Sequence, residues 1–168
     1  MIWKGHSPSV GLVTRSRTRT VMQISDFLSK AAVFAEMAAA NKESLLRDLA
    51  ARTASSVPLS AEVVTSELLK RESLGSTGIG KGVAIPHARF RDLNSPVGLF
   101  AKLKRPIEFD AIDRQKVDLV FVLLLPEAQQ NSQITSLALV ARKLREGPTL
   151  ADLRSKKVAT EIYDVLIA

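Results

Sequence analysis

The amino-acid sequence predicts one α/β layered domain in which helices cover both faces of a mixed sheet. Three observations favour this fold. The chain has 168 residues, of which 46% are apolar, which is enough for one hydrophobic core. Residues 119–125 form an apolar run without alternation, as is typical of a strand covered on both faces. Segments with the apolar spacing of amphipathic helices lie before and after this run.

Two helices are predicted in the first half of the chain. Residues 42–54 place leucine and alanine side chains on one stripe, and Asn41 is a suitable N-cap. Ser60 is expected to cap a second helix that extends to about Ser73. The chain between them contains Pro58, which indicates a short connection.

Short strands and a glycine-rich loop are predicted next. Residues 75–82 contain four of the eight glycines, which indicates a loop rather than a helix or strand. Residues 83–85 are expected to form a short strand, and residues 97–104 a strand with unequal faces that Pro106 ends. Residues 107–109 are expected to form a further short pairing segment.

Three helical segments are predicted after Pro126. The first is a long helix that ends at Gly147 and Pro148, and the second is a short helix with Thr149 and Asp152 as a capping box. In the first of these helices, the residues expected to face inward are Ile134, Leu137, Ala138, Ala141 and Leu144. The third segment carries the last apolar stripe of the chain, which consists of Val158, Ile162, Val165 and Leu166.

Composition excludes several function classes. The chain has no cysteine, which excludes disulfides, thiolate zinc sites and cysteine nucleophiles. Its longest apolar run is far shorter than the roughly 20 residues of a membrane-spanning helix. We therefore expect a cytoplasmic protein without membrane insertion.

The positive charge is concentrated at the N-terminus. Of the net charge of +7, residues 1–21 contribute four basic residues and no acidic one, which leaves 20 basic and 17 acidic residues. We interpret residues 1–21 as a disordered basic extension and residues 22–168 as the domain. A nucleic-acid-binding arm is the alternative, but no aromatic side chain interleaves the basic run 15–20, so no nucleic-acid partner is expected.

The glycine-rich loop nearly matches a nucleotide-binding P-loop. Gly75, Gly80 and Lys81 fit the pattern, but Gly82 stands where a magnesium-binding Ser or Thr is required. The loop also follows a predicted helix and enters a strand, the reverse of a P-loop. Its amides could still face an anion, or its glycines could only provide a tight turn.

His87 is the candidate nucleophile of the chain. It directly follows Pro86, which favours an extended backbone before it, and Arg71, Arg89 and Arg91 are nearby cations in the sequence. With a reference pKa of about 6.5, most imidazole is neutral at pH 7 and offers one nucleophilic nitrogen. Cationic groups and amides suit the charge of a transferring phosphoryl group. The pattern therefore indicates a phosphoryl-accepting histidine.

Residues 74–89, LGSTGIGKGVAIPHAR, resemble the active-site signature of the IIA components of the phosphoenolpyruvate-dependent phosphotransferase system. The fructose/mannitol type, and within it the nitrogen-regulatory IIA type, is the most similar. Further matching segments are residues 106–113, 117–127 and 137–144, and the similarity covers residues 22–168.

The resemblance implies a mixed five-stranded sheet between helices, and a bacterial phosphoprotein. It implies that an HPr-like carrier phosphorylates His87, and that Arg71 stabilises the developing charge. The predicted loop or phosphate-binding residues are Gly75, Ser76, Thr77, Gly78 and Gln133. No cofactor and no metal are expected.

Gln133 is a departure from the family pattern, which commonly has a second histidine there. An amide can donate a hydrogen bond but cannot gain a proton. The favoured hypothesis is thus a phosphohistidine-carrying regulator in nitrogen signal transduction, with protein targets such as sensor kinases or transporters. The alternative is a sugar-transport IIA component that passes phosphate to a IIB domain. Whether the chain counts as an enzyme stays open, because no small-molecule turnover of its own is expected.

Deletion of residues 1–21 should change neither the melting temperature nor the phosphorylation of the protein, because the extension lacks the pattern of a packed element. Thermal denaturation and a phosphorylation assay of the shortened chain check this. A large loss of either property would show that the extension is part of the domain.

Overall fold

The computed structural model of the protein describes residues 21–168, and the predicted basic extension lies almost wholly outside them. A single 3₁₀ turn, Ile24–Asp26, precedes the first strand. The strands are β1 (Leu28–Met37), β2 (Gly78–Gly80), β3 (Val83–Ala84), β4 (His87–Phe90), β5 (Val97–Ile107) and β6 (Val117–Pro126). The helices are α1 (Lys42–Thr53), α2 (Ala61–Ser73), α3 (Gln130–Lys143), α4 (Gly147–Ser155) and α5 (Ala159–Ile167).

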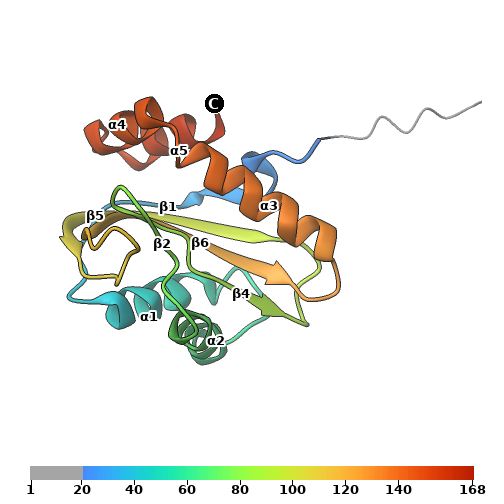
Figure 1. The fold of residues 1–168 in the computed structure, drawn as a ribbon. Coiled ribbons are helices and arrows are strands. Elements are labelled where there is room, and N and C mark those ends of the chain that lie inside the picture. The colour runs from blue at the N-terminus through green and yellow to red at the C-terminus, as the bar shows by residue number, and fades with distance from the viewer. Residues whose placement is uncertain (1–20) are drawn as a thin grey trace, which may run out of the picture.

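The strands form one mixed sheet in the order β1-β5-β6-β3-β2, with β4 also paired to β6. Strand β5 is antiparallel to β6, whereas β3 and β4 are parallel to it. Helices α1 and α2 lie on one face of the sheet, and α3, α4 and α5 lie on the other (Figure 1). The predicted α/β fold with helices on both faces is confirmed.

The sheet has six strands because the strand that leads into His87 is interrupted. Both β3 and β4 pair with β6, and only Ile85 and Pro86 lie between them. Pro86 has no N–H group to donate to a neighbouring strand. If β3 and β4 are counted as one interrupted strand, the sheet has the five positions that the resemblance implied.

Strand β6 supplies the centre of the core, because the side chains of residues 119–125 alternate between the two faces. Three of them pack with α1 and α2, and four pack with α3, α4 and α5. All seven are at most 1% exposed, and each such burial is worth about 1.5–3 kcal/mol. They are Val120, Val122 and Leu124 on the first face, and Leu119, Phe121, Leu123 and Leu125 on the second.

The two predicted helices before the glycine-rich loop are confirmed, with their caps. Asn41 accepts a hydrogen bond from the N–H group of Ser44 at 2.8 Å. Ser60 accepts one from Val63 at 3.2 Å. These caps fix where α1 and α2 begin, and so where the C-terminal end of α2 points.

Several details of the sequence analysis are wrong. Strands β1 and β4 were not predicted, and a three-residue strand, β2, lies within the segment interpreted as a loop. Strand β5 continues through Pro106, since its pairing with β6 is irregular between Lys102 and Ile107 and needs no N–H group there. Helix α4 already begins at Gly147 with Glu146 as N-cap, and no capping box forms.

Helix α3 is rotated relative to the expected orientation. Gln133, Ser136 and Val140 are buried, whereas Ile134 is 68% exposed and Ala138 is also exposed. The two buried polar side chains bond to backbone carbonyl groups, so a face with fewer apolar residues can still pack inward. Because of this rotation, Ile134 is exposed and lines the same groove as His87.

Candidate functional site

A groove of about 470 Å³ lies among the C-terminal end of α2, strand β4, the end of β6 and the first turns of α3. A smaller recess of about 350 Å³ shares Arg71 and His87 with it and extends to Ser76 and Thr77. The side chains of the groove that matter below are Leu74, Arg89, Gln133 and Ile134, together with Arg71 and His87.

His87 is the first residue of β4, and its half-buried ring has a defined tautomer. Its Nδ1 atom is 2.9 Å from the carbonyl oxygen of Ile85. A carbonyl oxygen can only accept, so Nδ1 carries the hydrogen atom of the neutral ring. The lone pair of a neutral His87 is therefore on Nε2, which is the nucleophilic nitrogen.

The surroundings of His87 favour the neutral ring. Burial lowers its pKa below the ordinary 6.5, and the positive charges of Arg71 and Arg89 lower it further. The hydrogen bond to Ile85 and the negative charge of Glu72 act in the opposite direction and raise the pKa, but the net shift is downward.

Arg71 projects from the last turn of α2 toward the recess that it shares with His87. Its Nη1 donates to the carbonyl oxygen of Gly75 at 3.0 Å, which is the one hydrogen bond that this side chain makes to any residue in 21–168. The remaining guanidinium N–H groups can therefore contact an anion bound at His87.

The glycine-rich segment is a β-hairpin rather than an open anion-binding loop. Strands β2 and β3 are joined by Lys81 and Gly82, which both have positive φ values, 55° and 77°. Two such residues make the two-residue turn typical of tight hairpins. The N–H group of Lys81 donates to Asp113 at 2.9 Å.

The structure gives a steric reason for a glycine at position 82, and this reason does not involve a nucleotide. A Cβ atom there would lie 2.5 Å from Nη2 of Arg154 and 2.7 Å from Oδ1 of Asp118. These two side chains form an ion pair at 2.8 Å across the turn. A side chain at the position that would hold Ser or Thr in a P-loop would therefore have to displace this ion pair, and the φ of 77° also disfavours it.

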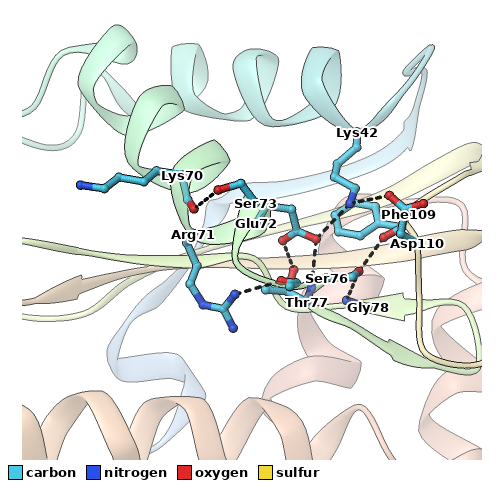
Figure 2. Close-up of polar contacts among 11 residues, drawn as sticks. Lys42, Lys70, Arg71, Glu72, Ser73, Ser76, Thr77, Gly78, Phe109 and Asp110 are labelled. Carbon is cyan, nitrogen blue, oxygen red and sulfur yellow. Dashed lines mark hydrogen bonds and ion pairs between the residues drawn. The ribbon is translucent and has the colours of Figure 1, made fainter.

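The predicted loop residues hold the hairpin in place (Figure 2). Ser76 donates its hydroxyl hydrogen to the carbonyl oxygen of Phe109 at 2.6 Å and accepts the N–H group of Gly78 at 3.1 Å. The N–H group of Thr77 donates to Glu72 at 2.9 Å. A Cβ atom on Gly78 would lie 2.7 Å from that of Ala111. The amides of residues 77 and 78 are therefore engaged within the protein.

Gln133 lines the groove but is engaged elsewhere. Its Nε2 donates to the carbonyl oxygens of Pro126 at 2.7 Å and of Glu127 at 3.1 Å. An amide nitrogen has two hydrogen atoms, and both are used. The donor that the sequence analysis expected to face a phosphoryl group is thus bonded to the end of β6.

Sequence reasoning missed Glu72, which is buried and contacts Thr77 and Lys42. A signal was present, because position 72 continues the apolar stripe of Val64 and Leu68 on α2. A glutamate on a buried face requires partners, and the sequence offers no means of naming them. Within residues 21–168, no group of three or more His, Asp or Glu side chains is placed to hold a metal ion.

A family model matches most of the chain. Residues 26–168 match the model described as phosphoenolpyruvate-dependent sugar phosphotransferase system, EIIA 2. A "Nitrogen regulatory protein" of Bradyrhizobium diazoefficiens is 41% identical over 145 residues, which cover 86% of this chain and 95% of the relative.

Solved structures are similar in fold. The nitrogen regulatory protein IIA-Ntr of Neisseria meningitidis has a TM-score of 0.82 and 31% identity, and the match covers 85% of this chain and 98% of that one. A structure of the Escherichia coli mannitol IIA enzyme in complex with phosphorylated mannitol IIB has a TM-score of 0.68 at 19% identity, with 82% and 95% covered. At this identity the likeness concerns the fold alone.

The ring of His87 should titrate below pH 6.5, and Arg71→Gln should raise its pKa toward that value. An unfolded histidine takes up its proton near pH 6.5, so the free energy of unfolding should fall as the pH drops from above 6.5 to the pKa of the folded protein. Imidazole NMR titration checks the pKa, with Arg91→Gln as the control. A wild-type pKa above 6.5 would contradict the expectation.

Proposed function

The chain belongs to the EIIA 2 family of the phosphoenolpyruvate-dependent sugar phosphotransferase system and is of its nitrogen type, and on this premise we propose that Nε2 of His87 accepts a phosphoryl group from an HPr-like carrier. The protein then regulates its partners according to its phosphorylation state. The bond from Nδ1 to Ile85 carries this proposal, because it leaves Nε2 as the nucleophile beside Arg71.

The proposed step exchanges one N–P bond for another. The lone pair of Nε2 attacks the phosphorus atom of the donor's phosphohistidine, and the electron pair of the breaking bond returns to the donor's ring nitrogen. The hydrogen atom on Nδ1 stays bonded to Ile85. The guanidinium of Arg71 lines the same recess as His87, and in this proposal it contacts the phosphoryl oxygens during the transfer and stabilises their charge.

The shape of the groove suits a protein donor. Leu74 is 81% exposed and Ile134 is 68% exposed, and both line the groove around His87, one beside α2 and the other on α3. Exposed apolar side chains around a reactive group favour contact with another protein surface. We place this encounter in the cytoplasm.

Phosphorylation would change the charge that partners meet at this surface. Arg71 and Arg89 make the groove cationic around His87, and a phosphoryl group brings about −1.5 to −2 charges at pH 7. A partner that contacts the groove would therefore distinguish the two states. Sensor kinases and transporters are the target classes that we propose.

A sugar-transport role is the second candidate, and the description of the matching family as part of a sugar phosphotransferase system favours it. Onward transfer to a IIB domain would be assisted by a group that can become charged beside the phosphohistidine. Gln133 cannot gain a proton, and both of its amide hydrogens bond to carbonyl oxygens. The regulatory role is therefore the better supported.

The protein should gain one phosphoryl group when it is incubated with phosphoenolpyruvate, the first enzyme of the chain and an HPr-like carrier. Intact-mass measurement follows the gain, which should be acid-labile. His87→Ala should remove it, whereas His6→Ala, which replaces the other histidine, should not. Full phosphorylation of His87→Ala would refute the assignment.

Wild-type protein should transfer little phosphate to a fructose-type IIB acceptor, and Gln133→His should raise that rate. The introduced imidazole can carry a positive charge beside the phosphoryl group, which the amide cannot. Single-turnover loss of labelled phosphate, with and without acceptor, is the measurement. Rapid transfer by the wild type would favour the transport role instead.

A further inference from the structure

Glu72 is a buried carboxylate whose oxygen atoms accept hydrogen bonds from the hairpin that leads to His87 (Figure 2). Only 4% of its side chain is exposed. Oε1 accepts the N–H group of Thr77 at 2.9 Å, and Oε2 accepts the hydroxyl of Thr77 at 2.5 Å. A carboxylate that is ionised acts only as an acceptor, which both of these oxygens do.

Thr77 connects this carboxylate to the backbone that orients His87. The carbonyl oxygen of Thr77 accepts the N–H group of Ile85 at 3.0 Å. The carbonyl oxygen of Ile85 in turn accepts the hydrogen on Nδ1 of His87 at 2.9 Å. Three successive contacts therefore lead from Glu72 to the imidazole ring.

Lys42 holds the other side of the carboxylate. Its Nζ atom lies 3.2 Å from Oε1 of Glu72 and 3.2 Å from Oδ2 of Asp110, and 4.8 Å from the ring centroid of Phe109. Lys42 is the first residue of α1, where the helix dipole disfavours a cation. Its contacts with Glu72 and Asp110 account for a lysine at this position.

Charged groups of both signs surround the ring of His87, and each sign favours a different part of a phosphorylated histidine. When Nε2 is phosphorylated and Nδ1 keeps its hydrogen, both nitrogens are substituted and the ring is a cation. Glu72 favours a cationic ring, since its negative charge raises the pKa of His87. Arg71 and Arg89 oppose the ring charge but favour the phosphoryl group.

The other charged residues that line the groove are not among the groups that shift the pKa of His87. Helix α2 also contributes Glu67 and Lys70 to the lining, and the end of β6 contributes Glu127. The residues of α3 that line it, Gln133, Ile134 and Leu137, are all uncharged. Glu72, rather than Glu67 or Glu127, is the anion whose charge raises the pKa of His87.

We propose that Glu72 is a positioning residue of the phosphoryl transfer: through Thr77 and the backbone of Ile85 it fixes the tautomer of His87, and its charge stabilises the phosphorylated ring. The proposal rests on the proposed function for the transfer itself. The tautomer and the charge effect are properties of the unphosphorylated protein, so they can be measured without any carrier.

Glu72→Gln tests the proposal, because glutamine keeps the shape and one of the two acceptor oxygens but removes the charge. We expect the pKa of His87 to fall further, and the single-turnover phosphorylation rate to decrease about 10- to 100-fold. Imidazole ¹⁵N NMR over a pH series gives the pKa and the position of the ring hydrogen. Glu62→Gln, on an exposed residue of the same helix, is the matched control.

Thr77→Val is the second variant, in case Glu72→Gln does not fold. It keeps the charge and removes the hydroxyl bond, so the population with hydrogen on Nδ1 should decrease. Glu72→Gln with an unchanged pKa, tautomer and rate would overturn the proposal, even if its melting temperature falls. If the wild type accepts no phosphate, the proposed function fails while the two NMR measurements still decide the role of Glu72.

Discussion

The burial of β6 on both faces is the constraint on which the other parts of the structure depend. Its alternating side chains hold α1 and α2 on one face and α3, α4 and α5 on the other. Its backbone pairs with β5 on one side and with β3 and β4 on the other. The interruption before His87 is therefore held against a strand that is buried on both faces, and this fixes the position of the imidazole ring.

The hairpin beside His87 is restrained at both ends, and by different means. At its open end the carboxylate of Glu72 binds Thr77, and at its turn Asp113 and Arg154 bind the backbone of Lys81. The buried end uses a charge that is compensated by Lys42, whereas the turn uses partly exposed groups. Preorganisation of this kind reduces the reorganisation that a transfer reaction would otherwise require.

Much of the fold could be predicted from the sequence, since α1, α2 and β6 have strong local patterns and clear end signals. Strand β1 could not, because three successive residues, 29–31, are exposed at the edge of the sheet and break the alternation. The rotation of α3 depends on the bonds of Gln133 to Pro126 and Glu127, which only the tertiary structure reveals. His87 and Arg71 could be predicted as site residues from the local sequence and the family resemblance, but Lys42, a partner of Glu72, is 30 residues away in sequence.

The interruption of the strand at Ile85 and Pro86 also affects how this site can vary during evolution. The group that selects the tautomer of His87 is a main-chain carbonyl, which every amino acid possesses. Replacement of Ile85 changes the packing around it, yet no codon removes the acceptor. The tautomer is thus protected against single substitutions at the position that provides it, and an alignment of related sequences would give no sign of its importance.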